Sequence, residues 1–213
     1  RIPRRARSQF RRRAEGLQPL APEILDTFQR LLAEAEAAGE PEPTAMTLAT
    51  AMPDGRVSAR TVLLKGADPA GFVFYTNTLS LKGRQLAANP HAALLFLWKR
   101  LRNQVQARIE GAIEPVTATE ADAYFATRPR DSQIGAWASI QSEELASREV
   151  FEQRCAEFDD RFAGGPVPRP PHWSGYRLCA ERVEFWYGMP FRLHDRHLWQ
   201  LRDGRWSECL LYP

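Results

Sequence analysis

Apolar and polar residues alternate along the chain with two different periods, and the period changes near residue 40. Residues 22–39, PEILDTFQRLLAEAEAAG, carry apolar residues at the spacing of one helix face. Pro22 suits a first helical turn, and Gly39 suits the position after a helix end. This pattern predicts an amphipathic helix over residues 22–39.

From residue 45 onward, apolar and β-branched runs are separated by turn residues. Residues 45–76 contain an Asp-Gly and an Asp-Pro-Ala-Gly turn between such runs, which predicts an antiparallel meander of three strands. Residues 80–89 predict a short helix with Ser80 as its N-cap, ended by Pro90. Further strands are predicted at 91–98 and at 104–116.

The second half of the chain mixes helices with strands. Helices are predicted at 118–127, capped by Thr117 or Thr119, and at 143–163, joined by RPRDSQIGAWASIQS. After a Pro-rich loop, strands are predicted at 176–188, 191–200 and 205–212. Strands outnumber helices and no βαβ rhythm occurs. We therefore expect an α+β fold, mainly antiparallel β, with one barrel and helices around it.

The basic residues are unevenly distributed. The net charge is +3, and among the 29 basic residues only Lys65, Lys82 and Lys99 are lysines. Seven arginines fall within the opening RIPRRARSQFRRR, which suits either a nucleic-acid arm or a solvated tail. We favour the tail because the candidate site lies elsewhere. Residues 1–20 are expected to be flexible and residues 21–213 to form a single domain that binds no nucleic acid.

Two further features bear on location. No stretch approaches the roughly 18 apolar residues of a transmembrane helix, and no apolar signal-peptide core stands near the start. The cysteines, Cys155, Cys179 and Cys209, are scattered without metal-ligand spacing, which favours free thiols in a reducing compartment. We therefore expect a cytoplasmic protein with no membrane association and no metal.

Candidate anion-binding groups occur in three segments, although the chain has neither GxGxxG nor GxxxxGK[ST]. Phosphate would have to be bound by cationic side chains, hydroxyls and helix N-termini. The segments are RTVLLK at 60–65, YTNTLSLK at 75–82 and YFATRPRDSQIGAWASIQS at 124–142. On a regular strand Arg60 and Lys65 face opposite sides. Tyr124 and Arg128 share a helix face, with Ser132 in the break beyond it.

A fourth segment, EFWYGMPFRLHDRH at 184–197, carries three cations at alternate positions. In an extended strand Arg192, His194 and Arg196 would share one face, where like charges repel unless an anion lies among them. Each of the four segments also has an ordinary structural explanation, such as a helix cap or a solvent-facing strand.

Taken together, the segments resemble the pyridoxine (pyridoxamine) 5′-phosphate oxidases of the FMN-binding split-barrel superfamily. The resemblance runs from about residue 43 to the C-terminus. It is carried by EPTAMTLAT, SARTVLLKG, GFVFYTN, RPRDSQIGAWAS, VEFWYG and RLHDR. So many ordered motifs make a chance match implausible.

The resemblance implies the residues of a site. FMN contacts are implied for Arg60, Thr61, Val62, Leu63, Leu64, Lys65, Tyr75, Thr76, Lys82, Gln106, Gln141, Ser142, Trp186 and Arg196. Substrate contacts are implied for Lys65, Tyr124, Arg128, Ser132, Arg192 and His194, the last two being catalytic and lying over the pyridine ring. The family also implies a homodimer with FMN at the subunit interface.

The implied reaction belongs to vitamin B6 metabolism. Pyridoxamine or pyridoxine 5′-phosphate loses a hydride from C4′ to flavin N5, pyridoxal 5′-phosphate forms, and O₂ is reduced to H₂O₂. The protein would align C4′ over N5.

The chain departs from the family pattern at several positions. Leu81 stands where many members have Arg, and Tyr187 replaces a more frequent Gln. Leu210 stands where an Arg is usual before the final residues. The segment NQVQARIEG makes Gln106 the flavin-contacting glutamine, with Gln104 on the same strand face as the alternative. These departures put FMN affinity and C-terminal regulation in doubt.

Two other functions remain open from the sequence. One is an FMN oxidase of the same superfamily that acts on another aromatic substrate, such as a phenazine precursor. The implied substrate-phosphate residues argue against it, because a ligand without phosphate would leave buried polar groups unpaired. The other is a non-catalytic flavin or pyridoxal phosphate binder.

Overall fold

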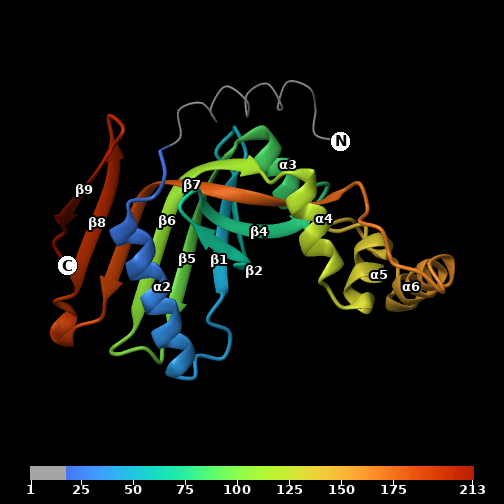
Figure 1. Ribbon diagram of the computed structural model, residues 1–213, viewed down its shortest axis with the longest axis horizontal. Coiled ribbons are helices and arrows are strands. Elements are labelled where there is room, and N and C mark those ends of the chain that lie inside the picture. Colours follow the sequence, from blue (N-terminus) through green and yellow to red (C-terminus); the bar gives the residue numbers. More distant parts are fainter. Residues whose placement is uncertain (1–17) are drawn as a thin grey trace.

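One long strand, β7, crosses the sheet and organises it (Figure 1). The computed structural model describes residues 18–213. The helices are α2 (Pro22–Ala37), α3 (Leu81–Ala88), α4 (Ala118–Ala126), α5 (Arg130–Ala138), α6 (Arg148–Arg161) and the 3₁₀ turn η1 (Pro190–Arg192). The strands are β1 (Ala45–Ala51), β2 (Val57–Leu63), β3 (Gly66–Asp68), β4 (Gly71–Asn77), β5 (His91–Trp98), β6 (Val105–Pro115), β7 (Trp173–Tyr187), β8 (Asp195–Arg202) and β9 (Arg205–Leu210).

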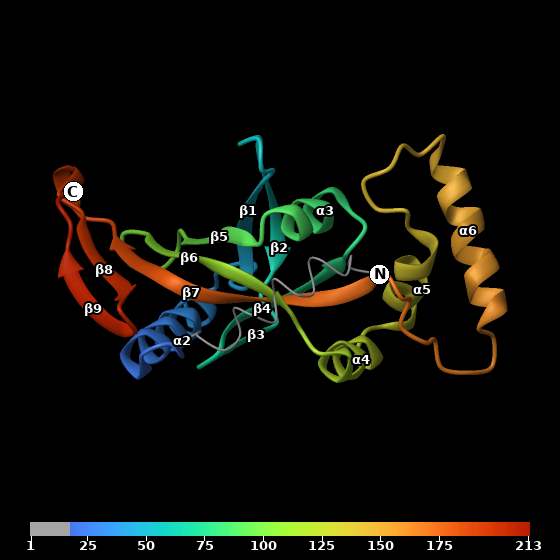
Figure 2. The same ribbon diagram turned by 90° about the horizontal axis from the view of Figure 1, so that it is seen from above.

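Every strand pairing among the described residues is antiparallel. The order is β2-β1-β5-β6-β7-β4-β3, and β8 and β9 continue from the second half of β7. β7 pairs with β4 over its first half and with β8 over its second half, while β6 lies along its other edge. Seen from above, the sheet curls and helices flank it (Figure 2). The predicted fold class, mainly antiparallel β with surrounding helices, is confirmed.

The predicted three-stranded meander at 45–76 is wrong. The segment forms two hairpins, β1–β2 and β3–β4, which lie at opposite ends of the strand order. β4 pairs with β7 because its residues are buried on both faces and it needs a neighbour on each edge. Local turn signals identify hairpins but do not decide which distant strand completes the sheet.

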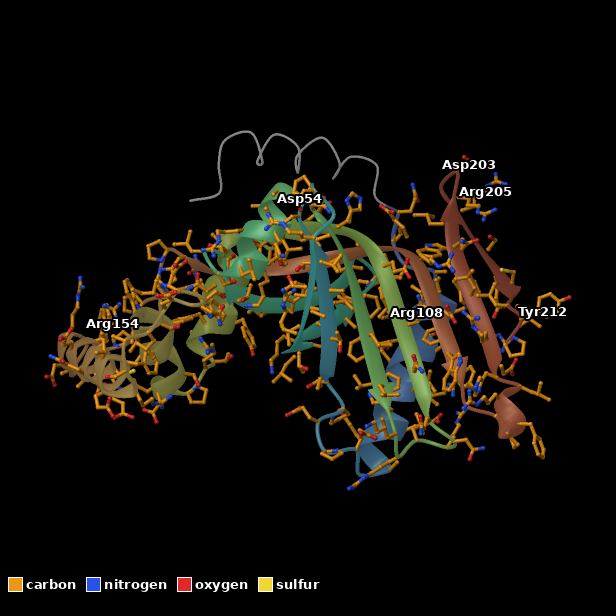
Figure 3. All side chains as sticks on the ribbon, turned by 180° about the vertical axis from the view of Figure 1, so that it is seen from behind. Asp54, Arg108, Arg154, Asp203, Arg205 and Tyr212 are labelled. Carbon is orange, nitrogen blue, oxygen red and sulfur yellow. The ribbon has the colours of Figure 1, made fainter. Side chains whose placement is uncertain are left out.

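Helix α2 covers one face of the sheet, as its predicted apolar stripe requires. Its Phe28 is fully buried and meets Phe72 of β4 edge-on at 4.9 Å and Phe96 of β5 at 5.1 Å between ring centroids. The opposite face carries Arg108 of β6 (Figure 3). The core therefore lies between α2 and the inner face of the curled sheet.

Helices α4, α5 and α6 lie at the end of the molecule opposite β8 and β9 (Figure 2). Thr117 caps α4 in a capping box with Glu120, as one of the two predicted caps. Helix α6 begins at Arg148, later than predicted, and the segment taken for a break contains α5. Sequence reasoning missed α5 because Pro and Gly, here Pro129 and Gly135, are typical of loops. In the structure Pro129 is the N-cap residue, just before the first turn of the helix. Ser132 therefore lies in the first turn of a helix.

The strand predicted at 191–200 is also corrected, because β8 begins only at Asp195. The preceding residues turn through η1, where Phe191 and Arg192 have φ of 57° and 63°. Arg192 and His194 therefore do not share a strand face with Arg196. Alternation of charges mimicked a strand, but Pro190 offers no N–H to a ladder and the backbone turns there.

The expected Arg-rich tail at 1–20 lies mostly outside the described residues. Its last residues are ordered, because Leu20 is buried and its N–H donates to the carbonyl of Pro69 at 2.7 Å. Within residues 18–213, no helix is long and apolar enough to cross a membrane.

Candidate active site

A cavity of about 660 Å³ lies between strands β2 and β4 and helices α3, α4 and α5. We call it the basic pocket. It brings together twelve predicted site residues, namely Arg60, Thr61, Val62, Leu63, Lys65, Tyr75, Thr76, Lys82, Tyr124, Arg128, Ser132 and Gln141. Arg60 and Lys65 both line this pocket, and β2 ends at Leu63, before Lys65. Segments far apart in sequence thus meet in one place.

The basic pocket has an unbalanced charge. Arg60, Lys65, Lys82 and Arg128 line it, and no Asp or Glu is among its described lining residues. Like charges gathered in a partly buried space raise one another's electrostatic energy unless an anion joins them. The lining therefore favours an anionic ligand.

Arg60 is fixed entirely by neutral oxygens. Its Nη1 donates to the carbonyl of Leu48 at 3.1 Å and to Thr50 Oγ1 at 2.6 Å. Its Nη2 donates to Ser58 Oγ at 2.9 Å and to Gln85 Oε1 at 3.2 Å. Burial lowers the pKa of Arg60. The guanidinium is thus held rigidly, while no carboxylate of the described residues pairs with its charge.

Lys82 is held in the same way at the start of α3. Ser80 caps this helix as predicted, its side chain accepting from the N–H of Gly83. Lys82 Nζ donates to Thr76 Oγ1 at 3.2 Å, Ser80 Oγ at 3.3 Å and Gln141 Oε1 at 3.0 Å. Burial, and secondly the charge of Arg60, lower the pKa of Lys82. A nearby anion would relieve both effects.

Arg128 has a donor that nothing in the described chain satisfies. Its Nη1 is buried without a hydrogen-bond partner. Its guanidinium lies 4.9 Å from the ring centroid of Trp173 and 5.7 Å from that of Phe125. Burial lowers the pKa of Arg128, although Tyr124 opposes this. Because buried donors are nearly always paired, this orphan indicates that a ligand supplies the acceptor.

An aromatic stack forms one wall of the basic pocket. Tyr75 stacks on Tyr124 at 4.1 Å and on Trp173 at 5.3 Å between ring centroids. Gly175 permits this, because a Cβ there would lie 2.7 Å from the Tyr75 ring. Sequence reasoning missed Trp173. The available signal was an aromatic and a Gly at alternate positions, 173 and 175, where β7 begins.

A second group of predicted residues lies on the outer face of the sheet. Gln106 of β6 is opposite Trp186 of β7, which is opposite Arg196 of β8. We call these three residues the strand row. Their register supports Gln106 over Gln104, which lies in the turn before β6 with φ of 73°. Side chains directly opposite one another across strands are neighbours.

His194 lies against the strand row. Its ring centroid is 4.4 Å from that of Trp186, and its Nδ1 accepts the N–H of Met189 at 3.2 Å. Both rings line a hollow of about 340 Å³ that is separate from the basic pocket. Arg192 is exposed on the same turn.

The structure does not bring all predicted residues to one cavity. The side chain of Leu64 is only 5% exposed and belongs to the core, and Ser142 is exposed beside Gln141. Helices α4 and α5, which line the basic pocket, lie at one end of the molecule and β8 lies at the other (Figure 1; Figure 2). Within one chain the basic pocket and the strand row are therefore separate.

Two family models match most of the chain. A family model described as pyridoxamine 5′-phosphate oxidase matches residues 32–162. A second, described as the pyridoxine 5′-phosphate oxidase C-terminal dimerisation region, matches residues 173–213.

Relatives of similar length are known in several bacteria. A pyridoxine/pyridoxamine 5′-phosphate oxidase of Myxococcus xanthus is 53% identical over 194 residues, which cover 91% of this chain and 93% of the relative. The corresponding oxidase of Sphingopyxis alaskensis is 57% identical over 194 residues, covering 91% and 89%.

Solved structures show the same architecture. PhzG from Burkholderia lata 383, in complex with tetrahydrophenazine-1-carboxylic acid, has a TM-score of 0.84 and 33% identity, covering 93% of this chain and 100% of PhzG. An FMN-binding protein of Nostoc punctiforme related to pyridoxamine 5′-phosphate oxidase has a TM-score of 0.71 and 19% identity, covering 91% and 99%. The second likeness concerns the fold alone.

Proposed function

Because the chain belongs to the pyridoxamine 5′-phosphate oxidase family, with its FMN-binding split-barrel fold, we propose that it makes pyridoxal 5′-phosphate. The substrates are pyridoxamine 5′-phosphate and pyridoxine 5′-phosphate, FMN is the cofactor, and O₂ is reduced to H₂O₂. One observation carries the proposal beyond family membership: four cations line a pocket whose described lining holds no carboxylate. Both FMN and these substrates are phosphate monoesters.

The residues of the basic pocket fit two phosphates. Lys82 is surrounded by the neutral oxygens of Thr76, Ser80 and Gln141, and Arg60 meets only neutral acceptors. Arg128, on the opposite wall, has a buried donor without a partner. Burial lowers the pKa values of these cations. A phosphate near each wall would stabilise their charged forms.

We assign FMN to the β2, β4 and α3 side of the basic pocket. The assigned residues are Arg60, Thr61, Val62, Leu63, Leu64, Lys65, Tyr75, Thr76, Lys82, Gln141 and Ser142, with Gln106, Trp186 and Arg196 of the strand row completing the site. Leu64 would contribute through its backbone, because its side chain lies in the core. When bound, FMN supplies the acceptor for the hydride that leaves C4′ and delivers the electrons to O₂.

We assign the substrate phosphate to Lys65, Tyr124, Arg128 and Ser132. Arg128 offers paired guanidinium donors, and Tyr124 and Ser132 offer hydroxyls from two helices that meet at the pocket. The aromatic stack fixes Tyr124, so the phosphate is gripped by groups that are already in place. This grip disfavours substrates that lack a phosphate, because the buried donor of Arg128 would stay unpaired.

Arg192 and His194 orient the pyridine ring from the η1 turn. Because the Nδ1 of His194 accepts a backbone N–H, the neutral ring carries its proton on Nε2. Through that N–H the ring can donate a hydrogen bond to the substrate while C4′ loses its hydride. Contact with Trp186 keeps the His194 ring in its orientation.

The site is proposed to be completed in a homodimer. Residues 173–213 match the dimerisation region of the family, and this region contains Trp186 and Arg196 of the strand row together with Arg192 and His194. Since the basic pocket lies at the other end of the molecule, we infer that the pocket of one subunit meets the strand row of its partner. FMN then lies at the subunit interface.

Two further assignments belong to the same proposal. Residues 21–213 act as one domain, because the basic pocket is lined by both the sheet and helices α4 and α5. The protein works in the cytoplasm, where its three free thiols, Cys155, Cys179 and Cys209, stay reduced.

One assay tests the activity. Purified protein with FMN is given pyridoxamine 5′-phosphate, and H₂O₂ and the product aldehyde are followed together. Equal amounts of both are expected, and pyridoxamine without phosphate should be a poor substrate. Turnover of tetrahydrophenazine-1-carboxylic acid, the ligand of PhzG, without turnover of pyridoxamine 5′-phosphate would overturn the proposal. Flavin that binds but is never reduced by the substrate would instead indicate a storage or delivery protein.

A further inference from the structure

A buried carboxylate joins two arginines beside the strand row. The side chain of Glu184 on β7 is only 2% exposed. Arg196 Nε donates to Glu184 Oε1 at 2.7 Å, and Arg108 Nη1 donates to Glu184 Oε2 at 3.0 Å. A carboxylate this deeply buried is costly unless both oxygens are paired, and here both are.

Glu184 lies on the same face of the sheet as the strand row. It is two residues from Trp186 along β7 and directly opposite Arg108 of β6. This is the face turned away from α2, where Figure 3 shows Arg108. Glu184 is thus the only acidic side chain, among the described residues, that hydrogen-bonds a member of the strand row.

Arg196 is held at two of its three nitrogens. Nε is fixed by Glu184, and Nη1 donates to the carbonyl of Tyr212 at 3.1 Å. Nη2 has no partner among the described residues. The planar guanidinium is therefore locked with one nitrogen available to a ligand. The hydrogen bond to Glu184 raises the pKa of Arg196.

We propose that Glu184 is a positioning residue for FMN, which acts by holding Arg196 with Nη2 directed at the cofactor. The inference rests on the proposed function, because it takes Arg196 as a cofactor contact. Glu184 does not touch FMN in this scheme. Its carboxylate sets the orientation of Arg196 and balances its charge, so Arg196 presents a hydrogen-bond donor with little net charge.

A purely structural role would predict a different result. Buried ion pairs contribute little to stability compared with apolar residues of the same size. A carboxylate is therefore not needed if the only role of this position is to stabilise the packing of β7 against β8. If Glu184 only stabilised the strand packing, its variants would change the free energy of unfolding but not the FMN affinity of the folded dimer. FMN affinity therefore separates the two roles.

The test uses the FMN-free dimer and FMN titration, followed by the change in flavin fluorescence. Glu184→Gln keeps the size of the side chain and removes its charge. We expect FMN to bind about tenfold more weakly, which corresponds to the loss of one charge-assisted hydrogen bond from Arg196 to FMN. Glu110→Gln is the matched control, since Glu110 is half-exposed on β6 and contacts Arg108 but does not contact Arg196. Its affinity should stay within about twofold of the wild type.

If Glu184→Gln folds poorly, a double-mutant cycle still tests whether Glu184 acts through Arg196. Glu184→Asp keeps the charge but shortens the reach, and is combined with Arg196→Lys, whose ammonium cannot reproduce the Nε contact. We expect Glu184→Asp to weaken FMN binding in the wild type and to add almost nothing once Arg196 is Lys. Additive losses would overturn the proposal, as would wild-type affinity in Glu184→Gln. A wild-type protein that does not bind FMN would instead refute the proposed function.

Discussion

The cations of the basic pocket and the cation of the strand row are stabilised in opposite ways. Among the described residues, Arg60 and Lys82 donate only to neutral oxygens, and Arg128 has a buried donor without a partner. Burial lowers the pKa of all three. Arg196 instead donates to the carboxylate of Glu184, which raises its pKa. The first three have no carboxylate partner among the described residues, whereas the charge of Arg196 is already paired with that of Glu184.

This difference assigns different ligand groups to the two regions. An uncompensated cation gains most from a phosphate, because the anion restores the charge balance that burial disturbs. A paired arginine gains little from another anion but can still donate a hydrogen bond to a neutral acceptor. We therefore expect phosphates in the basic pocket and the uncharged part of the cofactor at the strand row.

The largest expected effect comes from removing the orphan donor of the basic pocket. Arg128→Ala should raise the KM for pyridoxamine 5′-phosphate about 100-fold, which corresponds to about one or two charged hydrogen bonds. FMN affinity should change little. Steady-state kinetics and FMN titration measure the two quantities. Arg148→Ala, at an exposed ion pair of α6, is the control. A KM near that of the control would remove Arg128 from the substrate site.

The second prediction compares one residue from each region. Lys82→Ala should weaken FMN binding about 30-fold, since a phosphate contact is lost, with a smaller effect on the turnover of the FMN-saturated enzyme. Arg192→Ala should do the reverse, lowering turnover far more than FMN affinity. Equal loss of FMN in both variants would refute this division of roles.

The pH dependence of the basic pocket follows from Lys82. Because burial lowers its pKa, Lys82 in the folded protein loses its proton at a lower pH than a lysine of the unfolded chain. Between these two pKa values the unfolded chain binds more protons, so the stability of the FMN-free protein should rise with pH in that window. FMN affinity should fall over the same range, because the cation is lost.

Lys82→Met should remove both pH dependences. Melting curves of the FMN-free protein and FMN titrations at several alkaline pH values measure them. The strand row should contribute no such fall, since the pKa of Arg196 is raised. An unchanged pH profile in Lys82→Met would mean that another group titrates.

The smallest expected effect concerns the wall behind Arg128. Trp173→Phe keeps an aromatic ring but weakens the cation–π contact, so the KM for pyridoxamine 5′-phosphate should rise about threefold. Trp206→Phe, whose indole N–H bonds the carbonyl of Pro19 away from either region, is the control. A KM equal to that of the control would mean that Trp173 supports the fold and not Arg128.

Much of the secondary structure could be predicted from local pattern. The helix at 22–39, the Ser80 and Thr117 caps, and the strands at 91–98 and 104–116 agree closely with α2, α3, α4, β5 and β6. These features depend on neighbours within a few residues. The failures share a different cause. The partner of β4, the helix α5 and the turn before β8 each depend on contacts between distant segments.

The sequence by itself determined which kinds of groups are present: few lysines, phosphate-binding residue types in four segments, and the motifs of one family. It also determined the local elements, because propensity, capping and periodicity act over short distances. Only the tertiary structure decided which charges are paired. The sequence does not distinguish the cations Arg60, Lys82, Arg128 and Arg196. Within residues 18–213 the first three meet no carboxylate, whereas Arg196 is bound to Glu184. The physical reason is that the energy of a charge depends on its burial and its nearest partners, and folding alone brings these together.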